Sequence, residues 1–153
     1  MEVSFAWCFH EAIFLNFRKE SKIISVNGFV DIDTPLKLKD FIVKSLTEDK
    51  IEDLEVINLH EQTSILADYM VIGSGRSSRQ VISITEKLVH KLNLAGLKNI
   101  TTEGTSNGDW VVTDAGDVII HIFRPEVRDF YNIEKMWRPH NAFEVVSNNS
   151  LFG

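Results

Sequence analysis

Apolar residues spaced three and four positions apart predict helices in three parts of the chain. The first helix begins at Thr34-Pro35, because threonine caps free helix amides and proline suits the first helical position. The second follows a Ser77 to Gln80 capping box and stops near Gly96. In the third, Val127, Phe130, Ile133 and Trp137 form one apolar face, which assigns Phe130 and Trp137 to the core. The predicted helices span residues 34–48, 77–95 and 125–137.

Short runs of apolar residues between the helices predict strands at 54–59, 69–72, near Ile100, at 110–113 and at 118–123. The last two strands are close enough to form a hairpin. Ala115 tolerates a positive φ poorly, whereas Gly116 accepts one freely. The sequence therefore favours a three-residue loop with a glycine bulge over a two-residue turn.

The order of these elements is helix, two strands, helix, three strands, helix. This order predicts one α/β domain, a sandwich around a mixed sheet of roughly five strands. We expect the domain to span residues 34–140, after an N-terminal extension (1–33) of unknown role and before a flexible tail (141–153).

Composition and charge narrow the classes of partner. The 153 residues are 44% hydrophobic and 25% charged, which is typical of a globular domain, and the net charge is -6. An acidic chain is a poor binder of nucleic-acid phosphates and a better match for a basic protein. No stretch reaches the ~20 apolar residues of a membrane span, so no membrane partner is expected. Cys8 is the only cysteine, which favours a reducing compartment, the cytoplasm.

Five ordered sequence blocks resemble the RsfS/Iojap family of ribosomal silencing factors: residues 67–75 with 77–80, 103–104, 110–118, 121–123 and 128–137. The resemblance implies a non-catalytic domain that binds the large ribosomal subunit through ribosomal protein fourteen and obstructs joining of the small subunit. In the family this represses translation under nutrient limitation. A role in large-subunit assembly through the same surface is an alternative. Residues 1–33 lie outside the resemblance, and Ala115 departs from it, since relatives often carry a bulkier residue there.

The resemblance also implies a topology like that of polymerase-beta-type nucleotidyltransferases. Those enzymes need two carboxylates one residue apart to hold a metal ion. Glu86 is the only acid on the helix after Arg79, so the catalytic pair is missing and an enzyme is the lesser alternative. The turn Gly73-Ser74-Gly75-Arg76 could bind an anion, but a tight strand-to-helix turn is the favoured interpretation. No histidines share a metal-ligand spacing, so neither metal nor cofactor is expected.

Trp110 is the leading candidate for a partner-binding anchor, because it begins a strand after Gly108-Asp109 and tryptophan is enriched in interface hot spots. Nearby acids would complement a basic partner, although aspartate also suits turns for local hydrogen-bonding reasons. An apolar patch around Trp110 could instead form a homodimer. Arg128 and Tyr131 are expected to be exposed on the last helix. The predicted partner-binding set is Trp110, Asp109, Asp114, Asp117, His121, Arg128 and Tyr131.

Overall fold

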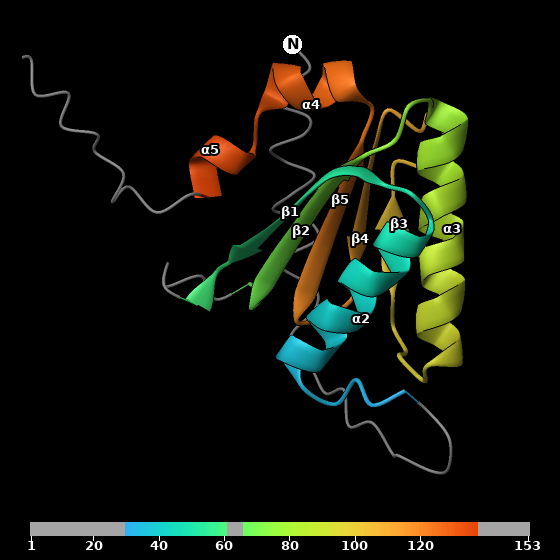
Figure 1. The fold of residues 1–153 in the computed structure, drawn as a ribbon, viewed down its shortest axis with the longest axis vertical. Helices are drawn as coiled ribbons and strands as arrows, with labels where there is room; N and C mark the ends of the chain where they lie inside the picture. Colours follow the sequence, from blue (N-terminus) through green and yellow to red (C-terminus); the bar gives the residue numbers. More distant parts are fainter. Residues whose placement is uncertain (1–29, 61–65, 138–153) are drawn as a thin grey trace, which may run out of the picture.

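The fold is available as a computed structural model, which describes residues 30–60 and 66–137 (Figure 1). The predicted tail and most of the predicted extension lie outside the described residues. The helices are α2 (Pro35–Glu48), α3 (Ser78–Leu94), α4 (Pro125–Tyr131) and α5 (Glu134–Trp137). The strands are β1 (Glu52–Asn58), β2 (Tyr69–Ser74), β3 (Thr101–Glu103), β4 (Trp110–Asp114) and β5 (Val118–Phe123).

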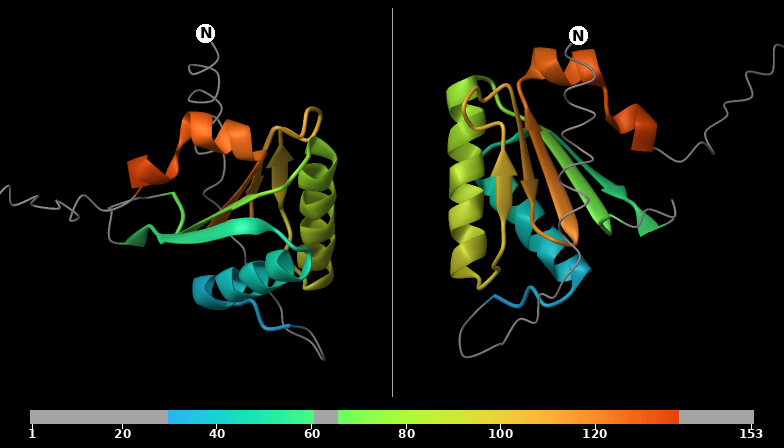
Figure 2. Two further views of the ribbon diagram at one scale, coloured as in Figure 1. Left: turned by 45° about the horizontal axis from the view of Figure 1, so that its top comes forward. Right: turned by 180° about the vertical axis from the view of Figure 1, so that it is seen from behind.

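The five strands form one mixed sheet in the order β1-β2-β5-β4-β3. Only the central pair, β2 and β5, is parallel, and the other neighbouring strands are antiparallel. Figure 2 shows α2 and α3 on one face of the sheet and the short α4 and α5 on the other. The predicted α/β sandwich with a mixed, roughly five-stranded sheet is therefore confirmed.

The two faces of the sheet build two cores, because successive strand residues point to opposite sides. The α2/α3 core contains Leu38, Ile42, Leu46, Val71, Val81, Ile84, Leu88, Leu92, Val111, Ile120 and Ile122. The α4/α5 core contains Ile57, Leu59, Met70, Ile72, Val112, Ile119, Phe123 and Ile133. Ile32 is 3% exposed and belongs to the α2/α3 core, so core packing begins before α2.

The starts of α2 and α3 agree with the capping predictions. Thr34 accepts a hydrogen bond from the Lys37 amide, and Pro35 takes the first helical position. At α3 the Gln80 amide donates to the Ser77 hydroxyl over 3.2 Å. The Gln80 side chain reaches one residue further back than in a standard capping box and accepts from the Arg76 amide at 2.7 Å.

The predicted three-residue hairpin loop is wrong. Asp114 pairs with Ile119, and the Ala115 amide donates to the Val118 carbonyl over 3.0 Å, which leaves a two-residue loop. Gly116 occupies its first position with a φ of 85°. Because a two-residue loop of this kind needs a positive φ only at its first residue, Ala115 keeps its ladder position and no bulge is required.

The single C-terminal helix predicted to reach residue 137 is also wrong. Asn132 adopts a left-handed conformation, with φ 42° and ψ 53°, and separates α4 from α5. Positions 127, 130, 133 and 137 therefore no longer share one face. Trp137 still packs against the α4/α5 core, as predicted, but Phe130 is 72% exposed and its assignment to the core is wrong.

Candidate partner-binding site

Trp110 lies in a cradle of aromatic side chains on the α4/α5 side of the sheet. Its ring stacks on the buried Phe123 at 4.8 Å between centroids and meets Tyr131 of α4 at 5.1 Å. Its Nε1 donates to Nδ1 of His121 over 3.1 Å. The indole is therefore oriented and its polar atom is bonded within the protein, while the ring stays only partly buried. A rigid aromatic with a free surface is the geometry of an interface anchor.

Two glycines fix the loop that leads into Trp110. A Cβ on Gly104, whose φ is 91°, would overlap the Trp110 carbonyl oxygen. A Cβ on Gly108, whose φ is 68°, would stand 2.6 Å from the Ser78 carbonyl oxygen. Side chains at either position would push the loop away from β4 and α3. The Glu103-Gly104 block of the sequence thus has a structural purpose close to the anchor.

Asp109 borders Trp110 and is held by two neighbours. Its Oδ1 accepts from Arg124 over 3.0 Å and from the Ser78 hydroxyl over 3.3 Å. Its side chain stays 49% exposed. Arg124 also forms an ion pair with Glu126, so this cation is shared between two acids. Sequence analysis did not select Arg124, whose long-range pairing follows from the β4–β5 register.

Asp114 and Asp117 are not close to Trp110. Trp110 begins β4 and Asp114 ends it, a separation of about 13 Å along the strand. Asp114 is 7% exposed and accepts from the Gly116 amide over 2.8 Å, so it serves the turn. Burial raises the pKa of both carboxyls, and the charge of Asp68 adds to the increase in the pKa of Asp117. The acidic rim expected from these residues around Trp110 is not formed.

Arg128 is a largely covered side chain that joins several elements, and not the exposed side chain that we expected. Its side chain is 12% exposed and pairs with Glu134 of α5. One Nη donates to the Asp53 carbonyl over 2.7 Å and to the Ser74 hydroxyl over 3.0 Å. Arg128 is covered because it reaches the Asp53 carbonyl. Strand β1 is irregular between residues 52 and 55, and Asp53 there has a φ of 48°, which leaves its carbonyl available to Arg128. Arg128 thereby fastens α4 and α5 to β1 and β2.

The predicted binding set therefore divides by position. Trp110, Asp109 and Tyr131 come together at a surface beside α4, whereas His121 is fully buried and supports Trp110. Phe130, which sequence analysis placed in the core, lies on that surface and contacts Tyr131 at 5.1 Å. The signal that could have located it is Asn132, since asparagine tolerates the left-handed conformation that ends a helix.

Two backbone amides of the Gly73–Arg76 turn donate hydrogen bonds to acceptors within the protein. The Gly75 amide donates to the Phe123 carbonyl over 2.8 Å, and the Arg76 amide donates to Gln80. The Arg76 guanidinium pairs with Glu52. These bonds support the interpretation as a tight turn.

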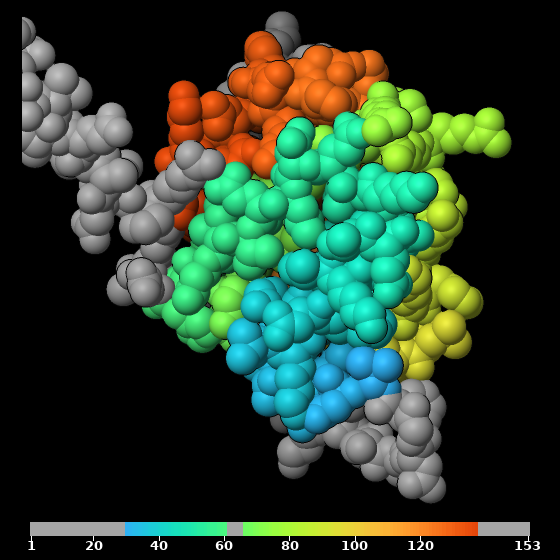
Figure 3. Space-filling view, viewed as in Figure 1, coloured from blue at the N-terminus to red at the C-terminus, as the bar shows by residue number. Residues whose placement is uncertain are grey.

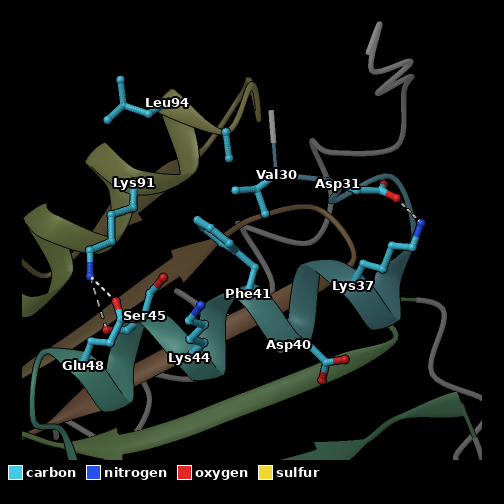
Figure 4. Close-up of a pocket in the computed structure, with 11 residues that line it drawn as sticks. Val30, Asp31, Lys37, Asp40, Phe41, Lys44, Ser45, Glu48, Lys91 and Leu94 are labelled. Carbon is cyan, nitrogen blue, oxygen red and sulfur yellow. Dashed lines mark hydrogen bonds and ion pairs between the residues drawn. The ribbon is translucent and has the colours of Figure 1, made fainter. Parts of the chain in front are cut away.

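A groove of about 670 Å³ runs between α2 and α3 (Figure 4). Phe41 lines it, and Lys91 and Lys37 border it in ion pairs with Asp49 and Asp31. It lies on the face of the sheet opposite the Trp110 ring. Across residues 30–60 and 66–137, no cluster of metal-ligating side chains occurs and no helix is long and apolar enough to span a membrane.

Comparisons with known proteins agree with this fold. The family model described as "Ribosomal silencing factor during starvation" matches residues 33–150. The ribosomal silencing factor RsfS of Zymomonas mobilis is 48% identical over 103 residues, covering 67% of this chain and 77% of that protein. A mouse protein named "Mitochondrial assembly of ribosomal large subunit protein 1" is 32% identical over 101 residues, covering 64% of this chain and 44% of that protein. A crystal structure of a Chromobacterium violaceum protein superposes with a TM-score of 0.64 at 33% identity, covering 68% of this chain and 86% of that one.

The fold and the matched relatives define a small α/β protein of a ribosome-related regulatory class. Within that class, the chain belongs to the RsfS family of ribosomal silencing factors. The family resemblance carried by the five sequence blocks is thereby confirmed.

Proposed function

We propose that this protein binds the large ribosomal subunit through ribosomal protein fourteen and blocks joining of the small subunit. It thereby represses translation in the cytoplasm when nutrients are limiting. The observation that carries the proposal is the Trp110 ring, oriented by Phe123, Tyr131 and His121 while part of its surface stays accessible. Residues 34–140 form the binding domain in this account.

The physical basis of the binding is preorganisation. Trp110 is already held by ring contacts and by its bond to His121, so docking freezes few additional rotations. Asp109 is half-exposed at its border and offers negative charge to a basic partner. Proteins that pack against ribosomal RNA carry excess cationic charge, because RNA phosphates demand it. The acidic surface of this chain therefore favours a protein contact on the ribosome over an RNA contact.

The action requires no covalent step. A bound domain fills space at the subunit interface, so the large subunit can hold either this protein or the small subunit. Mutual exclusion is reciprocal: an excess of small subunits must weaken binding of the protein by the same factor.

Sedimentation of purified subunits with and without the protein tests this proposal. We expect the protein to migrate with the large subunit and the fraction of joined ribosomes to fall as the protein is added. Isolated ribosomal protein fourteen should compete for the protein and restore joining. Migration of the protein with joined ribosomes, or binding that is unaffected by ribosomal protein fourteen, contradicts the proposal.

Large-subunit assembly is the second candidate, supported by the printed name of the mouse relative. The two functions predict different defects in cells that lack the protein. Silencing predicts normal large subunits and joined ribosomes that persist during starvation. Assembly predicts immature large subunits during growth, visible as a precursor peak in a subunit profile.

A further inference from the structure

Phe130 is the most exposed of the large apolar residues in the described part of the chain, at 72%. It directly precedes Tyr131, whose ring it meets edge to face at 5.1 Å and 87°. Tyr131 in turn contacts Trp110, which stacks on the buried Phe123. A continuous row of aromatic rings therefore runs from the α4/α5 core to the surface. Figure 3 shows α4 and α5 forming one end of the molecule beside the strands.

The backbone around Phe130 is held in place. Arg128, two residues earlier on the inner side of α4, binds Glu134, Ser74 and Asp53. Asn132 ends the helix in a left-handed conformation, and its amide donates to the Arg128 carbonyl over 2.7 Å. Phe130 is therefore presented on a clamped turn and not on a loose chain end. The backbone that carries Phe130 therefore loses little conformational freedom on binding, which favours the use of this residue in an interface.

The charges beside this aromatic row are acidic. Asp129 is exposed and forms no ion pair among the described residues, and Glu126 is exposed next to its partner Arg124. Arg124 itself is bound to both Asp109 and Glu126, so its charge is largely compensated. An apolar ring beside the exposed carboxylates of Asp129 and Glu126, of which Asp129 forms no ion pair among the described residues, matches an apolar depression bordered by lysine or arginine.

We propose that Phe130 extends the Trp110 contact, so that Trp110, Tyr131 and Phe130 together bind one apolar depression with a basic border on ribosomal protein fourteen. The inference rests on the proposed function and adds a second anchor to it. Ribosomal RNA is a poor occupant, because its phosphates would meet Asp129 and Glu126. A second copy of this chain, paired about a two-fold axis, would bring the same acids of both copies together.

The test compares the affinities of Phe130→Ala, Trp110→Ala and the unchanged protein for purified large subunits and for isolated ribosomal protein fourteen. Leu94→Ala is the matched control, since Leu94 is 62% exposed on α3, away from the aromatic row. We expect Phe130→Ala to weaken both interactions by at least about tenfold. Its thermal unfolding midpoint should match that of the unchanged protein, and Leu94→Ala should bind normally.

Three outcomes overturn the inference in distinguishable ways. If Trp110→Ala weakens binding and folded Phe130→Ala does not, the second anchor is refuted and the proposed function stands. If the unchanged protein binds neither the subunit nor ribosomal protein fourteen, the proposed function fails and the inference fails with it. If light scattering shows a dimer that Phe130→Ala dissociates while its subunit affinity is unchanged, the occupant is a second copy and the inference is wrong.

Discussion

The two faces of the sheet are covered very differently. On one face α2 and α3, with 14 and 17 residues, pack over a fully buried aliphatic core. On the other face α4 and α5 have only seven and four residues. The short cover leaves Trp110 partly buried and Phe130 exposed. One sheet thus has a fully covered aliphatic side and a second side with accessible aromatic surface, where we propose that the partner binds.

The central strand shows how one stretch of sequence serves both faces. In β5, Ile120 and Ile122 point into the α2/α3 core, whereas Ile119 and Phe123 point into the α4/α5 core. All six residues of β5 are buried. A shift of one residue in register would exchange the two sets, so Phe123 would no longer support Trp110.

The largest expected change in the free energy of unfolding comes from a substitution in the α2/α3 core. Leu88→Ala removes a fully buried side chain from this core and should lower the free energy of unfolding by about 2–5 kcal/mol. Urea denaturation measures the change. Leu94→Ala, an exposed position on the same helix, should change it by less than about 0.5 kcal/mol. Equal losses from the two variants would show that α3 does not bury the face assigned to it.

Arg128→Met tests whether the contacts of Arg128 stabilise the packing of α4 and α5 on the sheet. It leaves the carboxylate of Glu134, which is 6% exposed, buried without its cation. We expect a loss of about 3 kcal/mol of unfolding free energy, because an uncompensated buried charge is costly. Arg128→Met combined with Glu134→Gln should recover part of it. A double variant that is less stable than the sum of the single losses would contradict the pairing.

Ionic strength should have a modest effect on binding by the aromatic face. Few carboxylates border Trp110 and Phe130, so screening should weaken affinity for the large subunit by only a few-fold between about 0.05 and 0.2 M salt. Titrations at several salt concentrations measure the slope. A loss of about a thousandfold over this range is typical of many phosphate contacts and would indicate RNA-mediated docking.

The smallest expected change in the free energy of unfolding comes from the Asp114 carboxyl at the end of the β4–β5 hairpin. Burial raises the pKa of Asp114 above its ordinary 3.8, against the opposing bond from the Gly116 amide. Between 3.8 and the raised pKa the folded protein binds more protons, so its unfolding free energy falls as pH rises through that interval and stays lower above it.

Asp114→Asn keeps an acceptor for the Gly116 amide and removes the buried charge. At neutral pH it should stabilise the fold by less than about 1 kcal/mol, and the gain should vanish below pH 3.8. Thermal melts at both pH values measure it. Destabilisation at neutral pH would mean that the charge itself is required by the turn.

Local signals made α2, α3 and the sheet predictable from sequence. The Thr34-Pro35 start and the Ser77 cap act within one helical turn, so the residues themselves specify them. The role of Arg128 depends on a carbonyl exposed 75 positions away in β1, which no nearby pattern reports. Phe130 was misplaced because helical periodicity was extended through Asn132, where the backbone changes hand. The misassigned helix, Phe130 and Arg128 thus fall on the α4/α5 side, whereas the wrong loop length falls on the β4–β5 hairpin.

The central claim is that Trp110 serves binding more than folding. It is tested most directly by measuring large-subunit affinity and urea unfolding on the same preparation of Trp110→Ala. The account predicts an affinity loss of at least about 2 kcal/mol, roughly thirtyfold, with a stability loss below about 2 kcal/mol. A folded Trp110→Ala that binds the large subunit normally, or a Trp110→Ala chain that no longer folds, would contradict it.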